Sequence, residues 1–581
     1  MFIRLNIRQA KVGLSEGVRD VTLMGPLACA LLALGWLFPN HHRPWLSFHS
    51  EAWIAAGLTL ALIVVVLRVP SPCRFSTSFW VLLVVSGLPW LQHMAGLIPL
   101  PGDAWVSFAF LFGFALAVAL GETWQDLNTD APLDFMFGAI AIAAIACVGL
   151  QLYQMLGLTK SDGIADIWVL YLDDRGRPYA NMGQPNQLAT LLIWGLIAIA
   201  WALHKRAIRA TVAFGVCVYL VLGVALTQSR TAMLTLTLCV AAFWFLRGRL
   251  FTIQWFRGTL AIFAIFWLFV LSIGPVGRWL SLAIEASFVD RTQGEARFPA
   301  WRMFLDATME SPLLGYGWEH TREAQLAVAV KHPDMAHQLY SHAHNLFLDL
   351  VLWTGWPVGL VLSGLILHWL WQTFKSVSSH RQLLVFGALC ALGVHAMLEL
   401  PMHYAYFLLP AGVFAGVLNR LRSGPLLSWT IGKWTFLAMT LTAAILLCAI
   451  VRDYFLVEES LVDLRFETQR IGTNHNRKPP PTWLLNHWQD LIQLGREQPD
   501  SEMSPEEVEH LKALTLYYPS SANYEKMLKA LSMNGRHDEA KYWAERACAF
   551  FDEQTCVLVR SRWRASLPVD KGVQDTPAIS R

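Results

Sequence analysis

Long apolar runs recur along this chain of 581 residues, and they constrain its fold more than any other feature. Segments such as LTLALIVVVL and FWVLLVVSGL follow one another too regularly to belong to one buried core. Only 15% of the residues are charged, against about 25% in soluble domains. With their flanking residues, the runs reach the length of helices that cross a bilayer. The sequence therefore predicts an all-α polytopic membrane protein.

We predict about 12 to 13 transmembrane helices from these runs. They are expected at residues 20–38, 51–67, 79–98, 104–120, 134–157, 186–203, 208–227, 231–246, 258–274, 345–371, 382–400, 404–419 and 430–451. The first run follows a basic segment with Arg4, Arg8, Lys11 and Arg19, and no small-residue cleavage site comes after it. We therefore expect an uncleaved first span and not a signal peptide.

Lysine and arginine in the short loops predict the orientation, because they accumulate on the cytoplasmic side. With a cytoplasmic N-terminus, the loops on that side carry Arg68, Arg74, Lys205, Arg206, Arg209, Arg247, Arg249, Arg257, Lys375, Arg381, Arg420 and Arg422. The short loops on the other side, at 39–50, 99–103 and 401–403, carry only Arg43. Two long loops, 158–185 and 275–344, and the polar tail then lie opposite the cytoplasm.

The composition divides the chain into a transmembrane domain at 1–452 and a soluble helical domain at 453–581. In the tail, ANYEKMLKALSMNGRHDEAKYWAERACAFF predicts two helices around a turn. This pair is similar to one tetratricopeptide-like unit, and a generic helical hairpin remains the alternative. Cys548 and Cys556 are spaced so that a disulfide can form, whereas no CxxC or zinc-type spacing occurs. The net charge of +3 gives no indication of nucleic-acid binding.

The stretch YSHAHNLFLDLVLWTGW, residues 340–356, places two histidines before an apolar run. Asn345 can cap the expected helix, and His344 lies at its positive end, which disfavours an imidazolium ion. A neutral imidazole near pH 7 is the form that a general base needs. The alternative is an interfacial histidine with no reactive role. His342 and His344 could share a metal, but no carboxylates accompany them, so we expect neither a metal nor a cofactor.

Other polar residues open or close spans on the same face. Arg230, in TQSRTAML, begins a span. An arginine at membrane depth is energetically costly, so its presence there indicates a functional site. The alternative is a tight turn from which the side chain reaches outward to the interface. Gln184 and Asn186 also begin a span, for which capping alone is the alternative. Further candidates are Glu399, His403 and Tyr404 in LELPMHYAY, and Arg297 and Arg302 in ARFPAWRMFLDATMESPLLGYGW, where the alternative is a solvated amphipathic face.

Several arginines beside a neutral histidine fit one kind of chemistry. Arginines bind a pyrophosphate leaving group through paired hydrogen bonds. A neutral histidine can remove the proton of an incoming hydroxyl. Together these residues indicate transfer of a group from a pyrophosphate to a hydroxyl.

The motifs resemble those of the superfamily of bacterial O-antigen ligases, O-antigen polymerases and O-oligosaccharyltransferases. In that superfamily a large periplasmic loop ends in HxHN before a span, and in ligases ten residues separate the functional histidine from a glycine, as between His344 and Gly355. An arginine followed by three residues and a leucine is matched by Arg230 and Leu234, and P-x-x-G-x-G is matched at residues 312–317. GQPNQLAT at 183–190, LELPMHY and the C-terminal domain resemble the pilin-type protein O-oligosaccharyltransferases.

This resemblance implies a metal-independent enzyme of the inner membrane that works in the periplasm. It would move an oligosaccharide from undecaprenyl pyrophosphate to serine or threonine hydroxyls of a protein such as a type IV pilin. His344 matches the essential histidine, with His342 supporting it. Arg230 and Arg302 match arginines that hold the phosphates, and Arg297 lies close to Arg302 in the same loosely aligned loop. Gln184 and Tyr404 fall in stretches that protein ligases share.

Two alternatives to this function remain. The first lies within the superfamily, as an O-antigen ligase acting on lipid A-core or an O-antigen polymerase, and differs mainly in the acceptor. The second is a polytopic transporter of lipid or solute. Charged residues at mid-bilayer depth or an internal repeat would favour a transporter, and the sequence shows neither.

Overall fold

The structure is a computed structural model that describes residues 21–128, 130–158, 167–172, 176–250, 253–279, 297–335, 338–422, 427–471, 478–496, 498–549 and 551–566. The basic N-terminal residues Arg4, Arg8, Lys11 and Arg19 lie outside this range, as do parts of the loops 158–185 and 275–344 and the end of the tail. The described residues are helical almost throughout, so the all-α class is confirmed.

Each of the thirteen expected spans corresponds to helix in the structure. The matching helices are α1 (Val21–Ala33) with η2 (Leu34–Trp36), α2 (Phe48–Arg68), α3 (Thr77–Ser86) with α4 (Leu88–Met94), α5 (Pro101–Leu127), α6 (Ala131–Met155), α7 (Pro185–His204), α8 (Ala210–Leu226), α9 (Arg230–Leu250), α10 (Ile253–Trp279), α13 (Leu346–Ser376), α14 (His380–Ala396), α15 (Ala405–Leu421) and α16 (Lys433–Thr468). Seven of the described helices are long and apolar enough to cross a membrane, namely α2, α5, α6, α7, α10, α13 and α16.

The other elements are short. They are α11 (Arg297–Glu310), α12 (Thr321–Val328), η6 (Ala329–Lys331), η7 (Pro333–Met335), η8 (Pro401–His403), α17 (Asn486–Arg496), α18 (Pro505–Tyr517), α19 (Ser521–Met533), α20 (His537–Arg546), η9 (Ala547–Ala549) and α21 (Glu553–Ser566). Two strands, β1 (Cys73–Ser76) and β2 (Ser428–Ile431), pair antiparallel with Cys73 opposite Ile431. The sequence did not predict this pairing.

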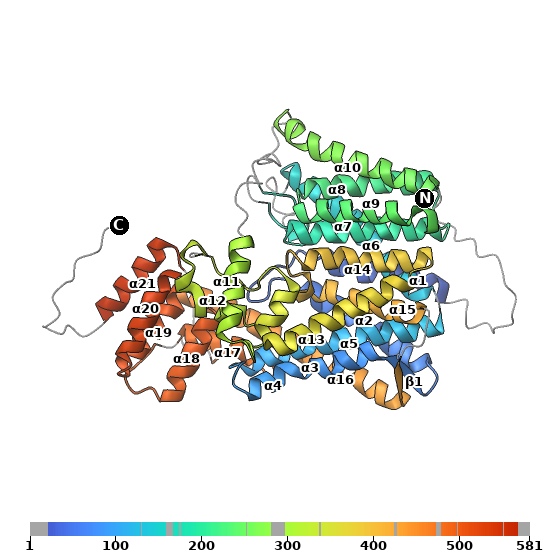
Figure 1. Cartoon of the computed structure of the whole chain (residues 1–581). Helices are drawn as coiled ribbons and strands as arrows, with labels where there is room; N and C mark the ends of the chain where they lie inside the picture. Colours follow the sequence, from blue (N-terminus) through green and yellow to red (C-terminus); the bar gives the residue numbers. More distant parts are fainter. Residues whose placement is uncertain are drawn as a thin grey trace.

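The long helices run side by side in one bundle, with α7 to α10 in a layer along one side (Figure 1). The helices α5 and α15 approach most closely because glycines face each other between them. A Cβ atom added to Gly416 would meet the carbonyl of Val118, and one added to Gly121 would meet the backbone of Val413. Small residues of this kind let helix backbones pack tightly inside membranes.

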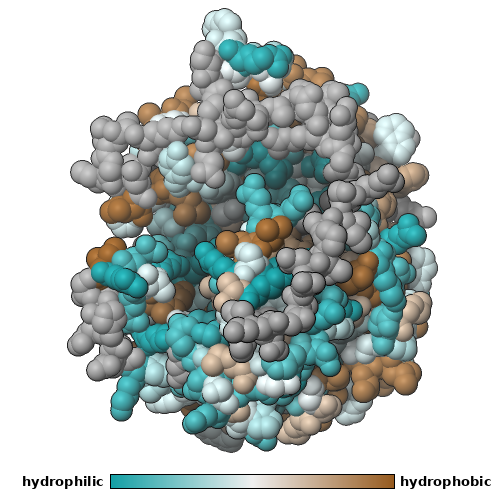
Figure 2. Space-filling view, turned by 90° about the vertical axis from the view of Figure 1, so that its left-hand side faces the viewer, coloured by the Kyte–Doolittle hydropathy of each residue, from teal (hydrophilic) through white to brown (hydrophobic). Residues whose placement is uncertain are grey.

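One end of the bundle collects the loop elements and the C-terminal helices. The helices α11 and α12 lie there beside α17 and α18, and we call it the loop end (Figure 1). Seen end-on, the loop end is largely hydrophilic and hollowed near its middle (Figure 2). Polar residues that follow or precede spans at this end can therefore meet at one site.

The C-terminal region joins the bundle without a break in the helix. The helix α16 continues past residue 452, where the sequence predicts a domain boundary, to Thr468, and α17 packs against both α5 and α16. The two helices expected around Asn534–Gly535 are present as α19 and α20. Cys548 and Cys556 form the disulfide that their spacing allows. On α12, the Arg322 guanidinium donates to the carbonyl of Tyr517, which links the long loop to α18.

Candidate active site

A break in α13 organises the loop end. Gly355 has φ +74° in the middle of that helix, and Pro357 has no N–H to donate to the carbonyl of Trp353. The side chain of Gln92 donates to that carbonyl at 2.7 Å, and the backbone N–H of Gly317 donates to it at 3.1 Å. The long loop is thereby hydrogen-bonded into the broken helix.

The P-x-x-G-x-G segment makes the rest of this junction. The carbonyl of Leu352 accepts from Tyr316 N–H, and the carbonyl of Pro312 accepts from Trp356 N–H, both at 2.8 Å. Gly315 has φ +69°, and a Cβ atom there would lie 2.6 Å from the nitrogen of Gly355. Two glycines are therefore required for this contact, which gives a physical reason for the motif and for its distance from His344.

The start of α13 fixes the segment with the two histidines. Asn345 caps the helix as expected, since its side chain accepts from Phe347 N–H at 3.1 Å and Leu348 N–H at 3.2 Å. The buried carboxylate of Asp349 accepts from Ala343 N–H at 2.7 Å. His344 itself has φ +57°, a conformation that is unfavourable for a non-glycine residue and is held here by its neighbours.

Three of the predicted histidines form a cluster. The ring centroids of His342 and His344 are 4.3 Å apart, and those of His342 and His403 are 6.0 Å apart. Burial lowers the pKa of His344 and of His403, and it lowers the pKa of His342 well below its usual value, with the two neighbouring histidines adding to the effect. All three rings are accordingly neutral near pH 7. For His344, burial is a larger cause than any neighbouring charge.

Three other predicted residues meet at the carboxylate of a fourth, Glu399. Glu399 accepts from the side-chain amides of Gln184 and Asn186, each at 2.6 Å, and from the Arg297 guanidinium at 3.2 Å. Burying a carboxylate is costly unless it is paired and hydrogen-bonded, and these three partners offset that cost. The Glu399–Arg297 pair acts electrostatically on His344, in opposite directions, so this group and the histidine cluster belong to one site.

Tyr404 lies next to this site. Its ring stacks on Tyr406 with centroids 5.2 Å apart, and the Tyr406 hydroxyl donates to Gln187 at 2.6 Å. Burial raises the pKa of Tyr404 to about 12, so its hydroxyl stays protonated. The N–H of Ala405 donates to Glu51 at 2.9 Å. The sequence did not single out Glu51, although a glutamate in the first turn of an apolar span is a detectable signal.

The two remaining arginines lie differently from Arg297. On α11, Arg297 shares a face with the buried residues Ala300 and Phe304, whereas Arg302 lies on the opposite, exposed face. Arg230 is partly buried and begins α9, which packs against α7 and α14. Since α7 begins beside Gln184 at the loop end and α8 returns alongside it to Leu226, α9 begins at the loop end as well, with Arg230 as its first residue.

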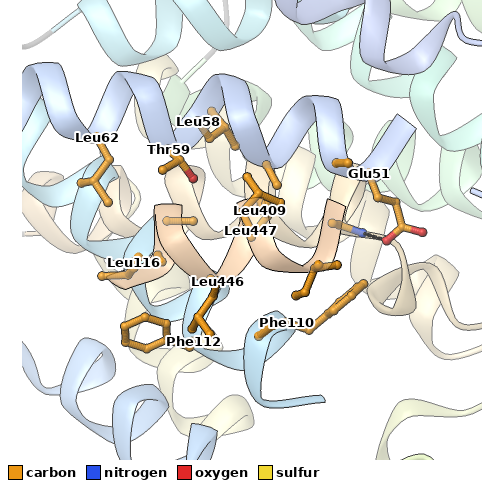
Figure 3. Close-up of a pocket in the computed structure, with 18 of the residues that line it drawn as sticks. Glu51, Leu58, Thr59, Leu62, Phe110, Phe112, Leu116, Leu409, Leu446 and Leu447 are labelled. Carbon is orange, nitrogen blue, oxygen red and sulfur yellow. Dashed lines mark hydrogen bonds between the residues drawn. The ribbon is translucent and has the colours of Figure 1, made fainter. Parts of the chain in front are cut away.

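An apolar crevice extends from this site between α2, α5, α15 and α16 (Figure 3). Glu51 lies at one end of it, with Leu58, Thr59 and Leu62 following along α2. At about 1.5 Å per residue, the distance from Glu51 to Leu62 is roughly 17 Å. The crevice therefore begins beside Tyr404 and Ala405 and continues among the membrane-type helices.

Among the residues that the structure describes, no group of three or more His, Cys, Asp and Glu side chains is arranged to hold a metal ion. The absence of a metal requirement stays a prediction.

Comparison with known proteins gives three family matches on different parts of the chain. Residues 215–363 match the O-antigen ligase family, residues 178–204 match the protein glycosylation ligase family, and residues 383–565 match the C-terminal part of a virulence factor membrane-bound polymerase family. The first two matches contain Arg230, His344, Gln184 and Asn186.

Two curated relatives from Acinetobacter baylyi match most of the chain. A general O-oligosaccharyltransferase is 29% identical over 402 residues, which cover 68% of this chain and 69% of the relative. A ComP-specific O-oligosaccharyltransferase is 29% identical over 391 residues, covering 67% and 69% respectively. With the helical bundle, these matches define a membrane-bound glycosyltransferase. The chain is similar to the O-oligosaccharyltransferases of the O-antigen ligase superfamily, which its motifs also resemble.

Proposed function

We propose that this protein transfers an oligosaccharide from undecaprenyl pyrophosphate to serine or threonine hydroxyls of a periplasmic protein such as a type IV pilin. One observation carries the proposal most directly. A neutral histidine, His344, lies in the same cluster as an arginine held by a carboxylate, the pair Arg297–Glu399. The two relatives support the general class of reaction, and their names describe their own substrates only.

His344 is suited to receive the proton of the acceptor hydroxyl. Its Nδ1 atom is buried and has no hydrogen-bond partner within the described ranges. In the proposed step a ring nitrogen of His344 that the acceptor can reach takes the hydroxyl proton while the hydroxyl oxygen bonds to the anomeric carbon. The bond from that carbon to the pyrophosphate oxygen breaks, and the pyrophosphate leaves with the electron pair. A direct displacement of this kind inverts the anomeric configuration.

Arginines stabilise the charge that grows on the leaving pyrophosphate. Arg297 bonds to Glu399 through one of its guanidinium nitrogens. Among the residues that the structure describes, its other N–H groups have no hydrogen-bond partner, so they can donate to a phosphate oxygen. Glu399 therefore orients Arg297, and Gln184 and Asn186 orient Glu399. We assign Arg230 and the exposed Arg302 to the donor phosphates as well, with Arg297 as the arginine that acts electrostatically on His344.

The apolar crevice supports a donor that carries a long hydrocarbon chain. Its length along α2, roughly 17 Å, matches about half of the ~30 Å hydrocarbon layer of a bilayer. Its lining is apolar apart from Thr59 and Glu51. The oxygens of Glu51 are already bonded to Trp45, Ser47 and Ala405. We propose that the first part of the polyprenyl chain lies here, with the pyrophosphate at the loop end.

The proposed location is the inner membrane, with the N-terminus in the cytoplasm and the loop end in the periplasm. The excess of lysine and arginine in the loops at the opposite end supports this orientation. The helices α17 and α18 lie at the loop end, so the C-terminal domain would share the periplasmic side with His344. A protein acceptor would approach from that side.

The match of residues 383–565 to a polymerase family favours one second candidate, an O-antigen polymerase. Co-expression with a lipid-linked glycan pathway and a candidate pilin distinguishes the two. The proposal predicts glycan on pilin serine or threonine residues by mass spectrometry, and none in a strain with His344→Ala. Unmodified pilin together with lengthened lipid-linked glycan would favour the polymerase.

A further inference from the structure

Glu319 is held at the loop end by the same junction that surrounds the break in α13. The N–H of the preceding residue, Trp318, donates at 2.9 Å to Gln92, whose amide also donates to the carbonyl of Trp353. Glu319 has φ +66°, an unfavourable conformation for a side chain of this size. Non-glycine residues in this region persist where the surrounding structure fixes them, often at functional sites.

The carboxylate of Glu319 faces the histidine cluster. Its Oε1 atom is 3.9 Å from Nε2 of His403, and its side chain is 35% exposed. In the described part of the chain, no lysine or arginine nitrogen lies within ion-pair distance of this carboxylate, whereas Glu399 is bonded to Arg297 and two amides. Glu319 also interacts electrostatically with His320 and Tyr517. Glu319 thus combines a carboxylate that has no lysine or arginine partner among the described residues with access to water.

The proposed reaction releases one proton in every cycle. The hydroxyl loses its proton to His344, and the pyrophosphate leaves as an anion that needs no proton. His344 must therefore lose that proton before the next cycle. Because the Nδ1 atom is buried, a proton that leaves from this side of the ring needs a path to water.

We propose that Glu319 is the exit of a proton relay that runs from His344 through His342 and His403. The inference rests on the proposed function and deepens it. The ring centroids are 4.3 Å apart in the first step and 6.0 Å apart in the second, and 3.9 Å separates His403 from Glu319. Only the last of these is a donor–acceptor distance, and at 3.9 Å it is slightly longer than a hydrogen bond, so we expect small side-chain rotations to close the steps as the proton moves. Each histidine gives up one proton as it receives one, and Glu319 passes the last proton to solvent.

In this scheme Glu319 is a positioning and relay residue that does not touch the sugar or the pyrophosphate. Its loss should slow turnover and leave donor binding unchanged. A small carboxylate in the buffer, such as formate, should replace part of its function. A purely structural role predicts neither the separation of kcat from KM nor the rescue by formate.

The test uses the full chain in liposomes with a lipid-linked glycan and a pilin acceptor. The variants are Glu319→Gln, Glu319→Asp, Glu319→Ala and the control Glu310→Gln, an exposed glutamate that pairs with Lys331. We expect Glu319→Gln and Glu319→Ala to lower kcat by about tenfold or more with the donor KM unchanged. Glu319→Asp should retain more activity, formate should restore Glu319→Ala, and Glu310→Gln should match the wild type.

Three results would overturn the relay. Wild-type turnover by Glu319→Gln would show that the carboxylate is not needed. Loss in Glu319→Ala that formate does not restore would indicate a structural role. Equal changes in kcat and in donor KM would indicate a role in binding. If the wild-type protein itself transfers no glycan to pilin, the proposed function fails first and the relay falls with it.

Discussion

The guanidinium of Arg297 lies 3.2 Å from the carboxylate of Glu399, although 102 residues separate them along the chain. Arg297 begins α11 in the long loop, and Glu399 follows α14. Gln184 and Asn186, from a third segment, complete the partners of Glu399. Three segments are therefore joined at one carboxylate beside the histidine cluster.

Replacing Glu399 with glutamine tests whether this carboxylate orients Arg297. We expect transfer to fall by about 10- to 100-fold, because a hydrogen bond to a charged group contributes roughly 1.5–3 kcal/mol. The control is Glu467→Gln, since the Glu467–Arg496 pair has side chains 10% and 14% exposed, close to the 11% and 20% of Glu399 and Arg297. Equal effects of the two variants on transfer would contradict a role for Glu399 in the site.

Arg230→Lys tests how the donor phosphates are bound. Lysine keeps the positive charge but loses the planar, forked guanidinium, so we expect at least about a tenfold loss of kcat/KM for the lipid-linked donor. Kinetics in liposomes with increasing donor concentration measure this loss. Full activity in Arg230→Lys would show that a point charge is sufficient, and the paired hydrogen bonds would be excluded.

The rate should fall at acidic pH because His344 must be neutral. Burial lowers the pKa of His344 below its usual 6.5, and Arg297 lowers it further, so the neutral base persists from pH 7 down to that lowered pKa. Removing Arg297 takes away one lowering cause and leaves Glu399, which raises the pKa. The acidic limb of the rate profile should therefore move to higher pH in Arg297→Gln. In Arg302→Gln the position of the limb should not change, and a shift there equal to that of Arg297→Gln would contradict the assignment.

Thr59→Trp tests the crevice as the site of the polyprenyl chain. Thr59 lines the crevice, so a bulky side chain there should raise the donor KM by about fivefold or more, the equivalent of roughly 1 kcal/mol of overpacking. The next residue offers a matched control, because Leu60 is 63% exposed on the outside of α2. Leu60→Trp should leave the donor KM unchanged. If both variants behave alike, the chain lies elsewhere.

Hydropathy predicted a helix at each of the thirteen apolar runs because the membrane imposes a local rule on such segments. The rule does not predict where α16 ends, since an apolar run marks the membrane boundary while the helix itself continues in polar sequence to Thr468. The pairing of β1 with β2 was missed because Cys73 and Ile431 are distant in sequence. Such contacts depend on packing that no short window contains.

The candidate site shows the same division. The sequence identified His344, Glu399 and their neighbours because polar residues beside apolar runs stand out. The sequence did not indicate that Arg297 faces Glu399 while Arg302 faces outward. Which arginine faces the site depends on how α11 is rotated about its axis when it packs on the bundle. Glu319 was missed because a glutamate in a long loop carries no signal until the break in α13 fixes its position beside His403.

The most direct test of the central claim is the transfer rate of purified His344→Ala with a lipid-linked glycan and a pilin acceptor. The change removes the ring nitrogen proposed to take the hydroxyl proton, so we predict a loss of about 100-fold or more. The amount of protein inserted in the membrane and the affinity for the donor should stay at wild-type levels. Glycosylation of the acceptor at the wild-type rate by this variant would contradict the role of His344 and the mechanism built on it.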